Sequence, residues 1–311
     1  MSVTSTESQP APLVSVVMAM YNDQTHVIRA IKSVEEQTYT NWEFVITDDC
    51  SKDGTYETVE AYVRNNPKIR LLRNEVNAGT YVSLNNCLKN VTGDYITNID
   101  SDDWFLPMKL EVQVAAMLAK PGCIVSWHAW EREQLKKTSM EGTIMYHKRV
   151  LTSVGYYDSV RFGGDTEFCK RIMRVFGKLK SVFIPQMMYH ATYRPGSLTS
   201  SPSINKNNPR SVYSFRLKKW HQAYKVNLYM PFPAPIRPFE VPEIMSPTRP
   251  AMAPTCPPEF CRIVFDRQQT ALTTEVTQML VNAVDVEVIR EHIRVRIAEN
   301  KTLQPLHQKR I

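Results

Sequence analysis

The sequence predicts an α/β fold of Rossmann-like type, in which a mostly parallel sheet is flanked by helices. The first observation is residues 14–20 (VSVVMAM), a continuous apolar run of the kind found in strands covered on both faces. The second is that strand-like runs alternate with segments whose apolar residues recur at helical spacing. The third is that the connections are short, which favours parallel strands linked by crossover helices.

The elements of this predicted sheet follow one another in order. After the first strand, Val27, Ile28, Ile31 and Val34 recur at the spacing of a helix. The next predicted elements are a strand at 42–47, a helix over 55–64, a strand at 69–72, a helix over 80–90 and a strand that ends at an acidic cluster. Beyond residue 120 the less regular pattern indicates a strand at 124–130, a strand leading into a helix and turn over 143–158, and a helix over 165–176.

The C-terminal part of the chain has a different composition. Residues 231–258 contain ten of the twenty prolines, too many for a regular element, which predicts an extended linker or a strap along the surface. Beyond it, residues 272–283 have the apolar stripe of an amphipathic helix, whereas 289–297 fit a helix or a strand. We therefore expect a disordered leader at 1–12, a main domain at 13–230, a proline-rich linker at 231–258 and a mainly helical C-terminal extension at 259–311.

The composition is that of a soluble globular protein, with 43% apolar and 10% aromatic residues among 311. No run of about 18 apolar residues is present, so no membrane-spanning helix is predicted. The N-terminal residues lack the features of a secretory signal and the six cysteines lack the spacing of a zinc finger, so we expect a cytoplasmic protein with reduced thiols. The net charge of +7 comes without a dense basic run, which argues against nucleic acid as a partner.

The segment DYITNIDSDDWFLP, residues 94–107, is chemically the most informative. Its apolar residues predict a short buried strand, which ends at Asp100, Asp102 and Asp103. Carboxylates placed so close together repel one another unless a cation neutralises them. Hard oxygen ligands of this kind suit Mg²⁺ or Mn²⁺. The alternative is a solvated acidic turn, because Asp and Ser also favour turns.

A second acidic pair, Asp48 and Asp49, follows the strand predicted at 42–47. In open parallel sheets, ligands bind beyond the carboxyl ends of the strands. Because this pair and residues 100–103 both lie at such ends, we expect them to belong to one ligand site.

Four segments, taken in order, resemble the pattern of the family 2 glycosyltransferases, which are nucleotide-sugar-dependent, inverting enzymes of the GT-A fold. The segments are VSVVMAMYND, WEFVITDDCSKDGT, NAGTYVSLNNCLKNVTGDYITNIDSDD and RVLTSVGYYDSVRFGGDTEFCKRIMRVFG. Each motif alone is weak, but their order and spacing over roughly residues 13–200 make the combination strong. The resemblance implies that residues 13–230 are a GT-A catalytic domain.

On the donor side, the resemblance implies that Asp48 and Asp49 hold the base and ribose of a nucleotide sugar, with a UDP-sugar as the expected donor. A carboxylate can accept a hydrogen bond from a nucleobase N–H, whereas the alternative is a solvated turn that caps the next helix. Tyr21 is expected to stack on the base, or else to be an ordinary turn aromatic. Asp102 is expected to bind Mn²⁺ or Mg²⁺, with Asp100 shared between metal and ribose.

On the acceptor side, Asp165 stands where the family has its catalytic base, which removes the proton of the attacking hydroxyl. The alternative is a plain helix N-cap. The usual pattern has an acid before this Asp, and here it is Gly164, which leaves open how the base is supported. Glu167 is expected to be a first-turn helix residue favoured by the helix dipole. Arg194, in a segment that resembles a mobile loop, is expected to neutralise phosphate, or else to be a solvated residue of a surface turn.

Together the motifs imply transfer of a single sugar, with inversion, to a hydroxyl of a glycan, lipid or protein. Processive synthases of this family carry a Gln-x-x-Arg-Trp motif that this sequence lacks, which favours a non-processive reaction. The alternatives are a nucleotidyltransferase and a degenerate transferase that only binds nucleotide sugar. The C-terminal extension is expected to pack on the catalytic domain, on a second copy of the chain or on a membrane surface, so a homo-oligomer and peripheral membrane contact both stay open.

Overall fold

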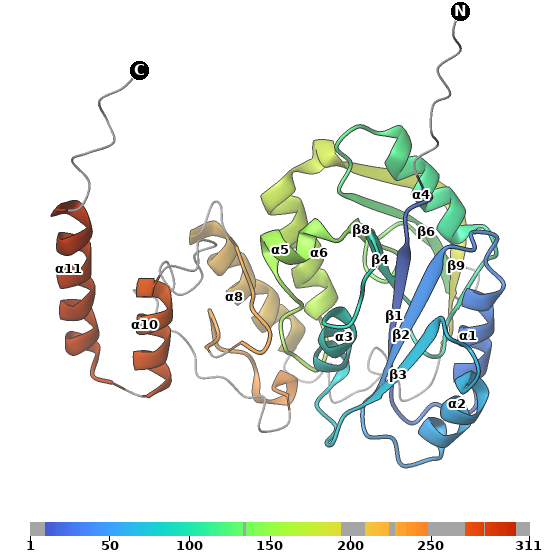
Figure 1. Ribbon diagram of the computed structural model, residues 1–311, viewed down its shortest axis with the longest axis horizontal. Helices are drawn as coiled ribbons and strands as arrows, with labels where there is room; N and C mark the ends of the chain where they lie inside the picture. Colours follow the sequence, from blue (N-terminus) through green and yellow to red (C-terminus); the bar gives the residue numbers. More distant parts are fainter. Residues whose placement is uncertain are drawn as a thin grey trace, which may run out of the picture.

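The computed structural model describes residues 10–132, 135–193, 209–223, 228–234, 236–247, 271–282 and 284–302. Residues 1–9 of the expected leader, and the segment that contains Arg194, lie outside these ranges. Within the described residues, nine strands form one mixed sheet in the order β3-β2-β1-β4-β8-β6-β9-β5, with β7 paired to β6. Helices flank this sheet, so the expected α/β fold is confirmed (Figure 1).

Most elements begin and end close to their predicted positions. The strands are β1 (Val14–Met20), β2 (Trp42–Asp48), β3 (Ile69–Arg73), β4 (Tyr95–Asn98), β5 (Trp104–Phe105), β6 (Val125–Arg132), β7 (Leu135–Lys137), β8 (Met145–His147) and β9 (Ser181–Ala191). The helices are α1 (Val27–Glu35), α2 (Thr55–Val63), α3 (Thr80–Leu88), α4 (Lys109–Ala119), α5 (Arg149–Val154), α6 (Gly164–Phe176), α8 (Pro209–Ala223), α10 (Ala271–Val281) and α11 (Val286–Thr302).

The first four strands form the parallel part of the sheet. β1 pairs with β2 on one side and with β4 on the other, and β3 joins β2, all in parallel. β8 then runs antiparallel to both β4 and β6, which makes the whole sheet mixed. Because β1 lies between β2 and β4, the carboxyl ends of these three strands meet at one edge.

Two apolar cores cover the two faces of the sheet. Side chains of α1, α2 and α4 pack on one face, against alternate residues of β1 such as Val16 and Met18. Side chains of α3, α5, α6 and α8 pack on the other face, where Val17 of β1 is buried. Successive strand residues point to opposite faces. The unbroken apolar run of β1 is therefore explained by burial on both sides.

The C-terminal region is helical in its described part. α10 and α11 lie at one end of the molecule, with α8 between them and the sheet (Figure 1). An apolar cluster joins Trp220 of α8 to Val276 of α10 and Ile289 of α11. Residues 289–297, which fitted a helix or a strand, are helix within α11. None of the helices in the described ranges is long and apolar enough to cross a membrane.

The described part of the proline-rich segment packs on the main domain. Ile236 and Met245 are buried, and Met245 belongs to the core that includes α6. Arg237 forms an ion pair with Asp158 at 2.5 Å, and both side chains are buried. The described part of this segment therefore lies along the surface of the main domain and is held there by these contacts.

Candidate active site

The carboxyl ends of β1, β2 and β4 place three sequence-predicted residues at one edge of the sheet. Tyr21 follows β1, Asp48 is the last residue of β2, and Asp100 comes two residues after the end of β4. Tyr21 is 44% exposed, so its ring is accessible to a ligand. The turn after it is braced, because the Asn22 N–H donates to the Ser51 hydroxyl at 3.0 Å.

Asp48 has one satisfied and one unsatisfied oxygen, although its side chain is fully buried. Its Oδ2 accepts a hydrogen bond from the Ser51 N–H at 3.1 Å and lies 3.4 Å from Nε of Arg73. Its Oδ1 is buried and has no hydrogen-bond partner among the residues that the structure describes. A buried polar atom without a partner is costly. This oxygen is therefore suited to receive a donor from a ligand.

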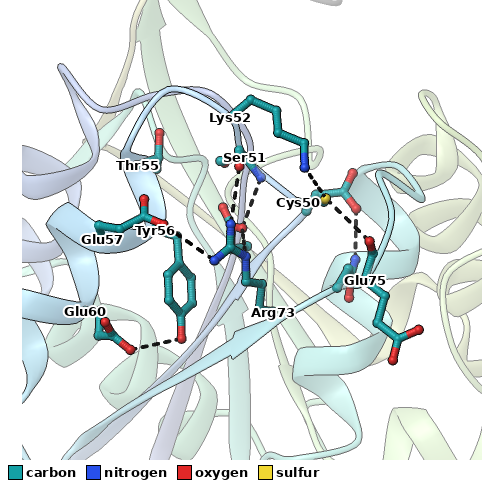
Figure 2. A network of polar contacts seen from close by, with 12 residues as sticks. Cys50, Ser51, Lys52, Thr55, Tyr56, Glu57, Glu60, Arg73 and Glu75 are labelled. Atoms are coloured by element: carbon teal, nitrogen blue, oxygen red, sulfur yellow. Dashed lines mark hydrogen bonds and ion pairs between the residues drawn. The ribbon is translucent and has the colours of Figure 1, made fainter.

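Arg73 is a site residue that the sequence analysis missed. It ends β3, lies over the ring of Tyr56 at 4.3 Å, and is 3.5 Å from Glu57. Figure 2 shows its guanidinium at the centre of a polar network that also includes Ser51. Arg73 directly follows the strand predicted at 69–72, which ends at the same sheet edge as Asp48. A basic residue at that position was the signal available in the sequence.

Asp49 is placed differently from its neighbour. Its carboxylate accepts hydrogen bonds from the side chain of Asn74 and from the N–H groups of Ala78 and Gly79, each at 2.8 Å. Gly79 has a φ of +99°, which favours glycine, and α3 begins immediately after it. The Asp49 side chain therefore shapes the turn that leads into α3.

The acidic loop at 100–103 contains carboxylates with raised pKa values. Burial among protein atoms, and then the charges of Asp103, Asp102 and Asp165, raise the pKa of Asp100 well above its usual range. Because the Asp100 residue is exposed to solvent, repulsion from the other carboxylates is the firmer of these causes. Burial and the charge of Asp102 also raise the pKa of Asp103 to about 7.

Asp103 ties this loop to β9. Its Oδ2 accepts a hydrogen bond from the Tyr189 hydroxyl at 2.6 Å, and its Oδ1 accepts one from the Thr192 N–H at 2.7 Å. Both contacts fix the loop against a strand that is distant in sequence. The carboxylates of Asp100 and Asp102 are the remaining candidates for a metal ion.

The donor set fits a divalent cation only in part. Carboxylates that raise one another's pKa values are relieved by a bound cation, and carboxylate oxygens suit Mn²⁺ and Mg²⁺. Within the described residues, however, no three His, Cys, Asp or Glu side chains converge to form a complete metal site. Asp100 and Asp102 could therefore hold a metal together with oxygens that a ligand supplies.

Asp165 lies in the first turn of α6, and its Oδ1 accepts a hydrogen bond from the Thr166 N–H at 2.7 Å. Burial is the largest cause that raises the pKa of this half-buried carboxyl, and the Thr166 N–H and the Tyr81 side chain act in the opposite direction. The charges of Asp165 and Asp100 act on one another. The structure therefore brings Asp165 to the same edge as the acidic loop.

Gly164 is explained by the ring of Tyr81. A Cβ at position 164 would lie 2.9 Å from two carbons of that ring and 3.2 Å from the carbonyl oxygen of Asp158. Tyr81 is buried, and its side chain lowers the pKa of Asp165 against the larger effect of burial. An aromatic side chain thus occupies the place in which the usual pattern has an acid.

Glu167 is more than a first-turn helix residue. It is fully buried and its two oxygens accept hydrogen bonds from Arg171 at 2.8 Å each, while Nε2 of His221 lies 3.0 Å from Oε1. Burial alone would raise the pKa of Glu167, but the charge of Arg171 and the bonds from His221 and Arg171 lower it. The dipole argument considers only neighbours along the helix, and it missed this network because His221 of α8 lies 54 positions from Glu167.

The chain was compared with known proteins. Residues 15–174, just over half of the chain, match a family model described as Glycosyl transferase family 2. EpsE of Bacillus subtilis (strain 168) is 42% identical over 105 residues, which are 33% of this chain and 38% of EpsE. WfgD of Escherichia coli, a UDP-Glc:alpha-D-GlcNAc-diphosphoundecaprenol beta-1,3-glucosyltransferase, is 40% identical over 106 residues, which are 34% of this chain and 41% of WfgD. The chain thus spans about two fifths of the length of these relatives.

A solved structure is similar in fold. Residues 1–349 of S. aureus TarS, in complex with UDP-GlcNAc, match with a TM-score of 0.53 and 21% identity over 60% of this chain and 60% of that chain. At this level of identity the likeness concerns the fold alone.

Proposed function

This chain belongs to glycosyl transferase family 2 and has the expected GT-A fold, and we propose that it transfers a single sugar, with inversion, from a nucleotide-sugar donor to an acceptor hydroxyl. The observation that carries the proposal is the convergence of Asp48, the acidic loop and Asp165 at one sheet edge, where the carboxylates of Asp100 and Asp165 repel one another. A metal–diphosphate complex would offset the repulsion between these carboxylates, and an acceptor hydroxyl could donate its proton to one of them.

The donor nucleotide is proposed to bind at the end of β2. The unpartnered Oδ1 of Asp48 would accept a hydrogen bond from a nucleobase N–H. Nε of Arg73 lies 3.4 Å from the other oxygen of Asp48, and the exposed ring of Tyr21 would stack on the base. Asp49 would act indirectly, since both its oxygens already accept hydrogen bonds. A UDP-sugar is the proposed donor, in line with the donor named for WfgD.

Asp102, with Asp100, is proposed to hold Mn²⁺ or Mg²⁺ beside the diphosphate. When bound, the metal ion supplies Lewis-acid stabilisation of the leaving diphosphate. The two carboxylates would orient the diphosphate through that ion, and Asp100 would also contact the ribose. Arg194, which lies outside the described residues, is proposed to add positive charge to the phosphates.

Asp165 is proposed to be the general base. Its carboxylate would take the proton of the acceptor hydroxyl while the hydroxyl oxygen forms a bond to the anomeric carbon. The bond from that carbon to the diphosphate oxygen breaks on the opposite face, so the configuration inverts. The raised pKa of Asp165 favours proton transfer, because a base works best when its pKa approaches the working pH.

The acceptor is proposed to be a glycan, lipid or protein hydroxyl. α10 and α11 are proposed as a surface for a second copy of the chain or for peripheral contact with a membrane. A module that binds nucleotide sugar without transferring it is the competing proposal, and it predicts binding without turnover.

The test is a thermal-shift panel of nucleoside diphosphates and their sugars, with and without Mn²⁺, followed by a transfer assay with the stabilising donor. A donor present at about a hundred times its dissociation constant should stabilise the protein by about 2.7 kcal/mol. Stabilisation that requires Mn²⁺ supports the proposed metal role. If no nucleotide sugar shifts the transition under either condition, the proposed function is wrong.

A further inference from the structure

We propose that Arg29 of α1 is a positioning residue that holds the backbone of Asp102 in the geometry needed for metal binding. The inference rests on the proposed metal role of Asp102 and concerns a residue on the outer side of the acidic loop. Arg29 would act through Asp102 and would touch neither the metal ion nor the nucleotide.

The first observation is a set of hydrogen bonds from one nitrogen. Nη2 of Arg29 donates to the carbonyl oxygen of Asp102 at 2.6 Å and to Oγ1 of Thr192 at 2.9 Å. The Thr192 hydroxyl in turn donates to the same Asp102 carbonyl. The Thr192 N–H donates to Asp103 at 2.7 Å. Arg29 thus joins α1, the acidic loop and the residue after β9 at a single point.

The second observation is the stacking of the same guanidinium. Its central carbon lies 4.1 Å from the centroid of the Trp104 ring, and Trp104 follows the acidic loop directly. The Trp104 ring also stacks on His190 of β9, with ring centroids 4.9 Å apart and an interplanar angle of 19°. The planar group of Arg29 therefore holds both the carbonyl at 102 and the side chain at 104.

A second contact from the start of α1 acts on the same loop. The Ser101 hydroxyl donates to Oδ2 of Asp23 at 2.7 Å, and the other oxygen of Asp23 lies 2.7 Å from Nδ1 of His26. The loop is therefore held on both sides of the backbone unit that carries the Asp102 carboxylate. Outer residues that orient metal ligands commonly change metal affinity about tenfold to a hundredfold when they are removed.

The proposed role requires an arginine side chain, and a positive charge alone would not fulfil it. A lysine could donate to the Asp102 carbonyl, but it lacks the planar group that stacks on Trp104 while donating two bonds. Arg29→Met removes both functions, whereas Arg29→Lys keeps one.

Lys32 supplies the matched control. It lies one turn further along α1, is exposed, and lines the same cavity of about 420 Å³ beside Trp104. No hydrogen bond from Lys32 to the acidic loop occurs among the described residues.

The experiment measures Mn²⁺ binding by electron paramagnetic resonance, on the full chain, alone and with UDP or GDP. We expect Arg29→Met to weaken Mn²⁺ binding in the presence of nucleotide by about tenfold to a hundredfold. Arg29→Lys should fall between this variant and the wild type, and Lys32→Met should match the wild type. Nucleotide affinity in EDTA should be equal in all four proteins. The residues proposed to contact the nucleotide base, Asp48 of β2 and its neighbour Arg73 of β3, are not on α1 and are not changed.

Two results would overturn the inference while leaving the proposed function intact. One is wild-type Mn²⁺ affinity in Arg29→Met. The other is an equal loss of nucleotide affinity in EDTA, which indicates general damage to the fold. If wild-type protein binds no Mn²⁺ with either nucleotide, the metal role of Asp102 and this inference fall together.

Discussion

The acidic loop at 100–103 and the buried network beneath α6 both contain carboxylates, but their charges are balanced in different ways. Glu167 is bonded to Arg171 and His221, and Asp158 is bonded to Arg237 and Tyr213. In the described part of the chain, no ion pair includes Asp100 or Asp103. Burial raises the pKa of all three carboxyls, but the partners of Glu167 bring its pKa below the usual value. The pKa of Asp158 stays raised although Arg237 and Tyr213 lower it, and neighbouring carboxylates raise the pKa of Asp100 further.

This difference separates carboxylates that stabilise the fold from the carboxylates that we propose to bind a metal ion. Repulsion between neighbouring carboxylates costs free energy, and carboxyls with strongly shifted pKa values gather at functional sites. The network under α6 holds the helix that bears Asp165, and the acidic loop presents charge to the outside. The predictions below change the acidic loop, the buried network, or the residues of α6 that lie beside them.

The largest effect is expected in the acidic loop. Asp102→Ala should abolish transfer and weaken binding of nucleotide sugar, and excess EDTA should do the same to the wild-type protein, because both remove the metal site. Asp94→Ala is the control: it lies before β4 and its ion pair with Lys148 at 2.8 Å is partly exposed, so its contribution is small. Full activity of the wild type in excess EDTA would contradict the metal role.

The second effect separates a base from a helix cap. Asp165→Asn should lower turnover by roughly 10²–10⁴-fold, because the amide cannot accept the proton. Asn caps a helix about as well as Asp, so the melting temperature should change little, and nucleotide affinity should be unaltered. Steady-state kinetics and nucleotide titration test this, and a variant with normal turnover would return Asp165 to a structural role.

The third effect concerns the stability of the buried network. Glu167→Gln should lower the free energy of unfolding by about 3–5 kcal/mol, because it leaves Arg171 buried without its charge partner. Glu291→Gln is the matched control, since the pair of Glu291 and Arg294 at 3.2 Å also lies within one helix but is exposed. That change should cost about 0–1 kcal/mol. Urea unfolding at pH 7 measures both, and equal costs would remove the distinction between the two regions.

The pH dependence follows from the direction of the Glu167 shift. Its pKa is lower in the folded protein than the usual value of 4.5, so ionised Glu167 stabilises the fold above that value. This contribution is lost as the pH falls through the lowered pKa. The stability difference between wild type and Glu167→Gln should therefore shrink as the pH falls below the usual Glu value of 4.5. A difference that grows on acidification would reverse the assigned sign.

The smallest effect tests the packing of α6 against α3 beside Asp165. Gly164→Ala should destabilise the protein by about 1–3 kcal/mol, because its Cβ would overlap the Tyr81 ring. In a Tyr81→Leu background the same change should cost less, since the ring is gone. A double-mutant cycle followed by thermal unfolding measures the coupling. Additive effects would indicate that Tyr81 and Gly164 are independent.

The sequence alone determined the α/β class, the parallel direction of the first strands and the positions at which acidic residues follow them. These features are local: a seven-residue strand β1 that is apolar except for Ser15, helical spacing after it, and carboxylates directly beyond a strand. Burial on one or two faces imposes such periods on any chain that folds this way. The family motifs are also short segments in a fixed order, so they too could be read from local sequence.

The tertiary structure alone decided which polar groups meet. Asp48 and Asp49 are adjacent, yet one keeps a buried oxygen without a partner and the other accepts three hydrogen bonds from residues 74–79. Arg29 reaches Asp102 across 73 positions, and His221 reaches Glu167 across 54. Side-chain contacts at such separations depend on how helices pack on the sheet. No local period specifies that packing, so the sequence predicted where charge would gather but not which charges would be paired.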